Sequence, residues 1–175
     1  MTRAFVSIGS NIDPEENVKK AVLLLAGRTT VRAVSTVYLT AAEDRPEQPP
    51  YYNCVVEIET EKPPVEVKQG ILRRIEAELG RVRTRDRYAA RTIDLDLVLY
   101  GDLVTKTEDL TLPDPDIVRR PYLAVPLEEL APGLLMPGSG MPIHEVASAL
   151  SRKAMNPLEG YTELIRKELT HERKQ

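Results

Sequence analysis

The chain has 175 residues and a formal net charge of −3, with 24 Lys and Arg against 27 Asp and Glu. This length is enough for one domain with a sizeable core, so we expect a single domain over residues 1–175. The near balance of charge argues against a general attraction to nucleic acid or membrane, and no apolar run approaches the ~18 residues of a membrane span. One cysteine, Cys54, argues against a disulfide framework and favours a reducing, cytoplasmic location.

The first sixty residues predict three strands and one helix. An apolar strand over residues 4–8 is followed by a helix from Pro14 to Gly27, which Asp13 can cap. Apolar, β-branched runs predict two further strands over residues 31–39 and 52–60, with Cys54 as a small core residue. The polar, proline-rich segment 40–51 between them is longer than a hairpin needs, and such loops are often functional.

The next elements complete the pattern of a known fold class. A second helix is expected from Pro63 to Leu79, and a fourth strand over residues 92–100. The order strand-helix-strand-strand-helix-strand predicts an α+β, ferredoxin-like split βαβ core, with an antiparallel sheet backed by two helices. Residues 110–133 are interpreted as irregular and proline-punctuated. A helix is expected over about 142–153, which ends the core 4–153, and a peripheral amphipathic helix over about 158–172.

Residues 81–91 form a basic segment with no apolar periodicity, in which five arginines face one acid: Arg81, Arg83, Arg85, Arg87 and Arg91 against Asp86. A guanidinium group binds phosphate oxygens in a bidentate manner, so a cluster of arginines suits an oligophosphate. A salt-bridged surface loop is the alternative interpretation.

Two aspartates follow the basic segment on the expected fourth strand. Residues two apart on a strand share a face, so Asp94 and Asp96 present paired carboxylates while Ile93, Leu95 and Leu97 are buried on the other face. Like charges this close raise each other's pKa or recruit a metal, and Mg²⁺ often takes one or two carboxylates plus phosphate oxygens. Arginines beside this pair suggest phosphoryl-type transfer. A solvated strand end is the alternative.

Four segments match a known family: FVSIGSN at 5–11, the stretch 38–53, the stretch 75–102 and LPDPDIVRRPYLAVPLEELAP at 112–132. The third is highly specific, because Gly-Arg-x-Arg, Arg-aromatic-x-x-Arg-Thr-x-Asp-x-Asp and Tyr-Gly-Asp follow in order. The chain resembles the 6-hydroxymethyl-7,8-dihydropterin pyrophosphokinases of folate biosynthesis, which move the β,γ-diphosphate of ATP onto a pterin hydroxymethyl group. The resemblance implies a ferredoxin-like α-β-α sandwich and a monomer that binds ATP and the pterin.

The resemblance also implies roles for the matching positions. Asp94 and Asp96 would bind two Mg²⁺ ions, and Arg81 and Arg91 would contact phosphate or close the loop, so these four residues are the expected catalytic set. The nucleotide side would include Glu76, Arg83, Arg87, Asp114 and Arg120. The pterin slot would be built by Thr40, Tyr51, Asn53 and Tyr122, because a flat heterocycle needs an aromatic face and its amide-like edge needs an Asn.

The chain departs from the family pattern at several of these positions. Tyr88 replaces a tryptophan and Ala89-Ala90 replaces Gly-Pro in the arginine loop, and Asp114 replaces the histidine of a Leu-Pro-His motif. A carboxylate near a triphosphate adds repulsion between like charges. Three outcomes are open: Asp114 pairs with Arg119 or Arg120, it becomes an additional Mg²⁺ ligand, or the site is impaired. We expect the pairing.

The expected function is Mg²⁺-dependent transfer of diphosphate from ATP to a hydroxymethyl dihydropterin, with AMP as the second product. Two alternatives stay open: a related protein that acts on another alcohol or only binds nucleotide, and a ferredoxin-like RNA-binding module with a basic loop. Against the RNA-binding module, the chain has one Phe and no Trp, and its expected strands carry no aromatic pairs on which bases could stack.

Overall fold

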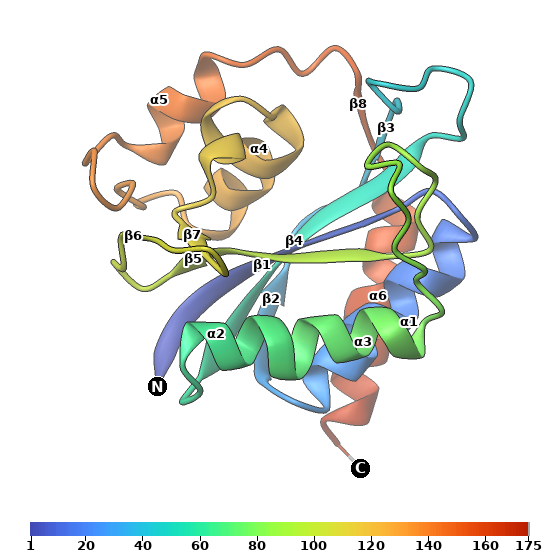
Figure 1. Cartoon of the computed structure of the whole chain (residues 1–175), viewed down its shortest axis with the longest axis horizontal. Coiled ribbons are helices and arrows are strands. Elements are labelled where there is room, and N and C mark those ends of the chain that lie inside the picture. Colours follow the sequence, from blue (N-terminus) through green and yellow to red (C-terminus); the bar gives the residue numbers. More distant parts are fainter. Residues whose placement is uncertain (175) are drawn as a thin grey trace.

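The centre of the computed structural model, which describes residues 1–174, is a six-stranded antiparallel sheet with helices on both faces (Figure 1). The strands lie in the order β5-β1-β4-β3-β8, and β2 also pairs with β4. Their bounds are Thr2–Ser10 (β1), Thr30–Val34 (β2), Tyr38–Thr40 (β3), Tyr51–Thr60 (β4), Asp94–Tyr100 (β5) and Met155–Pro157 (β8).

Helices form a layer on each side of this sheet. One face carries α1 (Pro14–Ala26), the continuous helical segment α2 (Pro64–Glu66), η1 (Val67–Leu72, a π-helical stretch) and α3 (Arg73–Glu78), and α6 (Glu159–Glu172). The other face carries α4 (Pro121–Leu130) and α5 (Ile143–Ser148), as Figure 1 shows. The arrangement is the α-β-α sandwich expected from the sequence. Within residues 1–174, no helix is both long enough and apolar enough to cross a membrane.

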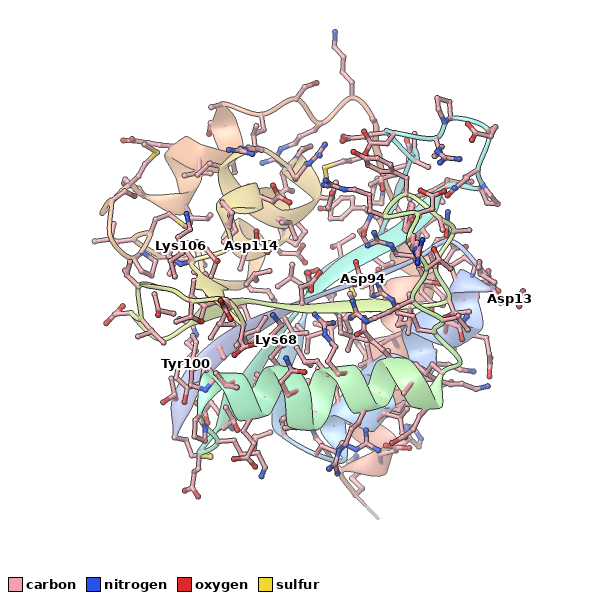
Figure 2. All side chains as sticks on the ribbon, viewed as in Figure 1. Asp13, Lys68, Asp94, Tyr100, Lys106 and Asp114 are labelled. Carbon is pink, nitrogen blue, oxygen red and sulfur yellow. The ribbon has the colours of Figure 1, made fainter. Side chains whose placement is uncertain are left out.

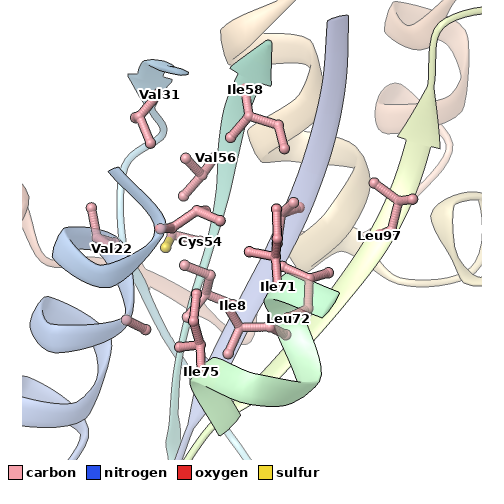
Figure 3. Packing of buried hydrophobic residues seen from close by; sticks show 14 of the residues in the cluster. Ile8, Val22, Val31, Cys54, Val56, Ile58, Ile71, Leu72, Ile75 and Leu97 are labelled. Carbon is pink, nitrogen blue, oxygen red and sulfur yellow. The ribbon is translucent and has the colours of Figure 1, made fainter. Parts of the chain in front are cut away.

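Each layer of helices encloses its own core. The larger one includes Ile8, Val56 and Ile75 and lies between the sheet, α1 and the α2–α3 segment (Figure 3). The smaller one includes Val55 and Leu127 and lies under α4 and α5. Neighbouring residues of a strand face opposite sides, so a central strand with both faces covered needs apolar residues at consecutive positions.

Strand β5 places its aspartates on the face covered by α4. Leu95 and Leu97 point into the larger core, so Asp94 and Asp96 point to the opposite face. The pairing of β5 with β1 shifts register by one residue at Val98. This bulge turns Leu99 into the smaller core, although an unbroken strand would have placed it with Leu97.

One expected strand and one expected helix cap differ from the structure. The single strand over residues 31–39 is wrong, because the chain forms β2 and β3 with a break at Ser35. The Ser35 hydroxyl accepts a hydrogen bond from the backbone N of Val55 at 2.9 Å, which replaces a regular ladder contact. Asp13 does not cap α1 with its side chain; it adopts a left-handed φ of 42°, and its carbonyl accepts from the backbone N of Asn17 at 3.0 Å.

The interpretation of residues 110–133 as irregular is also wrong. This stretch contains α4, which buries residues 123–127, and a 3-10 turn, η2 (Pro115–Val118). Pro121 stands at the start of α4, where a missing N–H is harmless, and Pro126 is buried within the helix. A small hairpin, β6 (Thr105–Lys106) with β7 (Thr111–Leu112), precedes them. Helix α5 ends at Ser148, earlier than the expected residue 153.

The C-terminal segment joins the sandwich more closely than a peripheral helix would. Strand β8 pairs with β3 at the edge of the sheet, and α6 contributes Ile165 and Leu169 to the larger core. The Thr162 hydroxyl accepts from the backbone N of Val37 at 2.9 Å. The outer face of α6 is exposed, as the amphipathic pattern predicts.

Candidate active site

A cavity of about 350 Å³ opens beside β5, between the sheet, helix α4 and the loops 41–50 and 81–91. Figure 2 labels Asp94 near the end of β5 that borders this cavity, and Tyr100 at the far end of the same strand. Most of the residues proposed from the sequence line it: Thr40, Tyr51, Asn53, Arg87, Arg91, Asp94, Asp96, Asp114, Arg120 and Tyr122. Segments far apart in the sequence therefore meet at one place.

The slot formed by β3 and β4 has a polar floor and aromatic walls. Thr40 pairs with Tyr51 across the two strands, and the Asn53 side chain donates to the Thr40 hydroxyl at 2.7 Å. Tyr122 reaches the cavity from α4. Burial raises the pKa of both Tyr51 and Tyr122, so each stays a neutral phenol. The slot suits a flat heterocycle with an amide-like edge.

Gly9 makes room for this arrangement. It lies opposite Asn53 in the pairing of β1 with β4. A Cβ atom at position 9 would lie only 2.7 Å from Asn53 Oδ1, which is too close for two non-bonded atoms. The glycine is therefore required for the side-chain position of Asn53. This role was not predicted from the sequence, although Gly9 stands in the matching segment FVSIGSN.

The two aspartates of β5 differ in how far nearby arginines balance their negative charge. Asp94 accepts from Arg91 at 2.6 Å and also from Arg81. Burial would raise the pKa of Asp94, but these two guanidinium groups outweigh burial and hold its pKa below the usual value. Asp96 has Arg73 at 3.5 Å, and its pKa is raised to about 6, first by burial and then by the charge of Asp94. Asp96 thus carries a charge that its surroundings do not balance.

This charge pattern fits a divalent cation. Within residues 1–174, no group of three or more His, Cys, Asp or Glu side chains is placed to hold a metal. Asp94 and Asp96 provide two carboxylates on one cavity wall, and Mg²⁺ is typically held by one or two carboxylates together with water and phosphate oxygens. The donor set therefore suits Mg²⁺ that arrives with a phosphate substrate.

Three of the proposed residues do not line the cavity: Glu76 and Arg81 lie behind its wall, and Arg83 is 59% exposed. Glu76 is buried, with a side chain 3% exposed, and contacts Arg73, Arg81 and Arg83. Arg81 is held between Glu76 and Asp94 and also donates to the carbonyl of Ile93 at 3.2 Å. The structure places these charges next to the carboxylates and away from the open part of the cavity. Arg73 was not proposed from the sequence, because nothing in a helical pattern distinguishes it from a surface arginine.

The expected pairing of Asp114 with an arginine is wrong. Among the described residues 1–174, Asp114 has no arginine partner; its carboxylate accepts from the backbone N of Asp116 at 2.8 Å and so caps η2. Arg120 instead pairs with Glu43 of the loop 41–50. Burial raises the pKa of Asp114. A short polar side chain that begins a helical turn satisfies the backbone locally, and this contact outcompetes a more distant guanidinium.

The two loops that border the cavity contact each other. Arg45 pairs with Asp86 at 2.8 Å, and the Gln48 side chain donates to the carbonyl of Tyr88 at 2.8 Å. Asn11 joins both loops: it donates to Gln48 at 3.1 Å and accepts from the backbone N of Arg91 at 2.8 Å. Asn11 and Gln48 were not proposed as functional residues, although both stand in matching segments.

A second cavity of about 230 Å³ adjoins the first. Asp96 and Asp114 line both cavities. Its other walls are apolar at Leu97, Leu110 and Pro115, and the remaining lining residues are polar or charged: Lys68, Glu108, Asp109 and Thr111. The carboxylates therefore stand between two compartments, each large enough for part of a substrate.

Residues 5–132 match the family model of 7,8-dihydro-6-hydroxymethylpterin-pyrophosphokinase. The chain belongs to this family. Two similar proteins are the 2-amino-4-hydroxy-6-hydroxymethyldihydropteridine pyrophosphokinases of Haemophilus influenzae and of Synechocystis. The first is 38% identical over 142 residues, which cover 79% of this chain and 88% of that protein. The second is 35% identical over 158 residues, which cover 89% and 80%.

Solved structures agree on the fold of this pyrophosphokinase family member. The Plasmodium falciparum HPPK-DHPS structure with pteroate superposes with a TM-score of 0.70 at 11% identity, over 89% of this chain and 47% of that chain. An HPPK-DHPS structure in complex with substrates gives a TM-score of 0.63 at 12% identity, over 85% and 44%. The chain spans under half the length of these structures. At such identities the likeness supports the fold alone, and the predicted ferredoxin-like α+β class is confirmed.

Proposed function

We propose that the cavity between β5 and α4 is where this chain moves the β,γ-diphosphate of ATP onto the hydroxymethyl group of 6-hydroxymethyl-7,8-dihydropterin. As a member of the pyrophosphokinase family, the chain is an ATP-dependent diphosphotransferase of folate biosynthesis, as the sequence predicts. The observation that carries the assignment of the site is the meeting of a slot for a flat heterocycle with the Asp94–Asp96 pair in one cavity.

The pterin binds in the slot of β3 and β4. Asn53 recognises the amide-like edge of the ring, and its contact with Thr40 fixes the orientation of its side chain. Tyr51 and Tyr122 provide aromatic surfaces on the cavity wall. This orientation directs the hydroxymethyl group towards β5, where the aspartates lie.

The nucleotide approaches from the second cavity. Its base occupies the space beside Leu97, Leu110 and Pro115, since these are apolar walls adjoining the carboxylates. Its phosphates then lie between Asp96 and the arginines of the first cavity, Arg87, Arg91 and Arg120. We assign the pterin to the first cavity and the nucleotide base to the second because Asp96 and Asp114 line both cavities and so lie near both substrates.

Asp94 and Asp96 would hold the Mg²⁺ ions, and the family resemblance supports a count of two. Bound Mg²⁺ neutralises phosphate charge in reactions of this class. The hydroxymethyl oxygen attacks the β-phosphorus and its proton passes to solvent, while the bond from that phosphorus to the α-phosphate oxygen breaks and AMP leaves with the electron pair of that bond. Arg81 and Arg91 each donate to one carboxylate oxygen of Asp94. Asp94 therefore holds these two arginines in place and is a poor proton acceptor.

The loops 41–50 and 81–91 exclude water from the reaction. Their mutual contacts through Arg45, Asp86 and Gln48 close one side of the cavity. Exclusion of water limits hydrolysis of ATP and strengthens the interaction of arginines with phosphate.

We also propose an oligomeric state, a domain organisation and a location for this protein. The family resemblance supports a monomeric enzyme, and the near balance of charge together with one Phe and no Trp argues against a nucleic acid partner. The two cores share one sheet, which supports a single domain over residues 1–175. Cys54 is a buried free thiol, and one such thiol without a disulfide supports a cytoplasmic location.

Product analysis tests the proposal. The protein is incubated with ATP, Mg²⁺ and 6-hydroxymethyl-7,8-dihydropterin, and nucleotides are separated. We expect AMP only when both the pterin and Mg²⁺ are present, and a loss of at least ~10³-fold in kcat/KM for Asp96→Asn, because a ligand of the metal is removed. Asp102→Asn, an exposed carboxylate after β5, is the control and keeps normal turnover. ADP with a monophosphate ester would contradict the reaction.

A further inference from the structure

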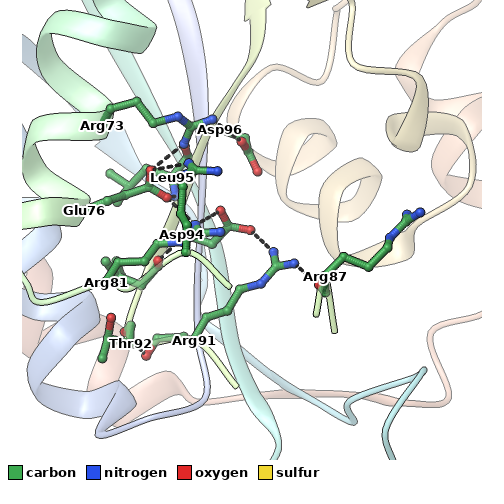
Figure 4. Close-up of polar contacts among 12 residues, drawn as sticks. Arg73, Glu76, Arg81, Arg87, Arg91, Thr92, Asp94, Leu95 and Asp96 are labelled. Atoms are coloured by element: carbon green, nitrogen blue, oxygen red, sulfur yellow. Dashed lines mark hydrogen bonds and ion pairs between the residues drawn. The ribbon is translucent and has the colours of Figure 1, made fainter. Parts of the chain in front are cut away.

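Glu76 lies near the end of α3, directly behind the two aspartates of the cavity (Figure 4). Its side chain is 3% exposed, and both carboxylate oxygens are fully engaged. One oxygen accepts from Arg73 and, at 3.2 Å, from Arg83; the other accepts from Arg81 and, at 3.2 Å, from the backbone N of Leu95. A buried carboxylate with this many donors is fixed in place.

The two partly buried arginines, Arg73 and Arg81, extend from Glu76 to the strand on either side of Leu95. Arg73 donates to the carbonyl of Leu95 at 3.1 Å and lies 3.5 Å from Asp96. Arg81 donates to the carbonyl of Ile93 at 3.2 Å and contacts Asp94. Each arginine is thus divided between Glu76, the strand backbone and one aspartate. Figure 4 shows this bridge from the helix to both carboxylates.

We propose that Glu76 is a positioning residue for the two metal-binding carboxylates and acts on them through Arg73 and Arg81. The proposal rests on the assignment of Asp94 and Asp96 as the Mg²⁺ ligands. Glu76 shares the positive charge of the two arginines and thereby leaves the aspartates able to bind a cation. Without it, each guanidinium would pair with its aspartate alone and compete with Mg²⁺.

This arrangement predicts that substitutions of Glu76 and of Arg73 change the affinity for Mg²⁺ in opposite directions. Glu76→Gln removes a negative charge, so the Mg²⁺ concentration for half-saturation should rise by about 5-fold or more. Arg73→Gln removes a positive charge beside Asp96, so the same concentration should fall by about 2-fold to 3-fold. Turnover should fall by at least ~10-fold in both variants, because neither holds the carboxylates at their native spacing. A purely structural role would shift both variants in one direction.

Calorimetry separates metal binding from catalysis. The full chain is titrated with α,β-methylene ATP, which lacks the bond that breaks, at a series of Mg²⁺ concentrations, and separately with 6-hydroxymethylpterin. We expect the pterin affinity to stay within about 2-fold in both variants, since the slot around Asn53 lies on other strands. Glu78→Gln is the matched control: Glu78 is on the same helix, pairs with Arg28 at 2.6 Å and is 47% exposed. It should leave Mg²⁺ dependence and turnover unchanged.

Arg73→Lys adds a rescue test, because a lysine keeps the positive charge near Asp96; it should restore the native Mg²⁺ half-saturation more fully than turnover. If Glu76→Gln does not fold, Arg73→Gln decides alone, since Arg73 is 22% exposed and its removal leaves the core intact. Native Mg²⁺ dependence in Arg73→Gln, or a parallel loss of pterin and Mg²⁺ affinity, overturns the proposal. A wild-type protein that releases no AMP contradicts the proposed function separately, because the Mg²⁺ titration with the analogue does not depend on turnover.

Discussion

At the scale of single residues, Asp114 is the clearest departure of this chain from its family. It lines both cavities, and its carboxylate caps η2 through the backbone N of Asp116. Its negative charge faces the space assigned to the nucleotide phosphates. An amide side chain at this position would keep the cap, since Asn and Asp cap helical turns about equally well, and would remove the repulsion.

We therefore predict that Asp114→Asn lowers the KM for ATP by about 3-fold to 10-fold at pH 8, with little change in the KM for the pterin. Steady-state kinetics with each substrate varied in turn measure both values, and Asp102→Asn serves as the control. A raised KM for ATP together with a raised requirement for Mg²⁺ would instead identify Asp114 as a ligand of the metal.

The pKa of Asp96 gives the metal-free protein a distinct pH dependence. It is raised to about 6, first by burial and then by Asp94, whereas the usual value is about 4. Because the folded value lies above the unfolded one, ionisation of Asp96 destabilises the fold progressively as pH rises from about 4 to about 6, and the destabilisation persists above that range. Bound Mg²⁺ requires the ionised form and compensates its charge.

Mg²⁺ should accordingly raise the melting temperature more at pH 8 than at pH 5. Thermal unfolding of the wild type and of Asp96→Asn, with and without Mg²⁺, checks this expectation. The difference between the two pH values should largely disappear in Asp96→Asn. An equal Mg²⁺ effect at both pH values in the wild type would show that Asp96 does not bind the ion.

At the scale of elements, the close approach of β1 to β4 shapes the pterin slot. Gly9 is required because a Cβ there would meet Asn53 Oδ1 at 2.7 Å. We predict that Gly9→Ala raises the KM for the pterin by at least ~10-fold, because the Asn53 amide must move, while the affinity for ATP changes little. Gly133→Ala, where a Cβ has no atom within 4 Å, is the control. A normal KM for the pterin in Gly9→Ala would place the pterin elsewhere.

Helix α6 stabilises the sandwich from the side away from the active site. Ile165 is 1% exposed and belongs to the larger core, whereas its neighbour Leu164 is 47% exposed. Ile165→Ala should lower the free energy of unfolding by about 2–4 kcal/mol through loss of buried area and formation of a cavity. Leu164→Ala should change it by less than about 1 kcal/mol. Urea unfolding measures both; equal values would mean that α6 is peripheral.

Some of the strands and helices could be predicted from the sequence, and others could not. Strands with alternating or continuous apolar residues were found, and so was the shared face of Asp94 and Asp96, because both follow from local periodicity. Helix α4 was missed, since two prolines obscured its pattern and only its packing on the sheet shows that it forms. The break at Ser35 and the bulge at Val98 depend on partners in β4 and β1, which a linear pattern does not contain.

Several residues of the candidate site were predicted from motifs, but their contacts with other segments were not. The residues proposed for the pterin slot and the two aspartates were predicted from motifs, and the structure brings them to one cavity. The surroundings of Glu76 were not predicted: Arg73 lies three residues away on the same helix, a spacing at which side chains meet, but Arg81 reaches Glu76 from the loop after the helix. The partner of Asp114 was predicted wrongly for a similar reason: proximity in sequence favoured Arg120, but Arg120 extends to Glu43 of another loop.

At the scale of the whole molecule, the sandwich joins two compartments at one strand. The layer of α4 and α5 supplies one wall of the pterin cavity, and the layer of α3 supplies the buried charges behind β5. Strand β5 lies between them and carries Asp94 and Asp96, which the account assigns to Mg²⁺. The proposed reaction therefore requires metal ions at this position when both substrates are bound.

The most direct measurement is a crystal structure with Mn²⁺ in place of Mg²⁺, α,β-methylene ATP and 6-hydroxymethylpterin, with anomalous data for manganese. We predict anomalous peaks at about 2.0–2.2 Å from carboxylate oxygens of both Asp94 and Asp96, between the pterin hydroxymethyl group and the phosphates. Peaks bound only to phosphates or to other side chains, with Asp94 and Asp96 still paired to arginines alone, would contradict the account.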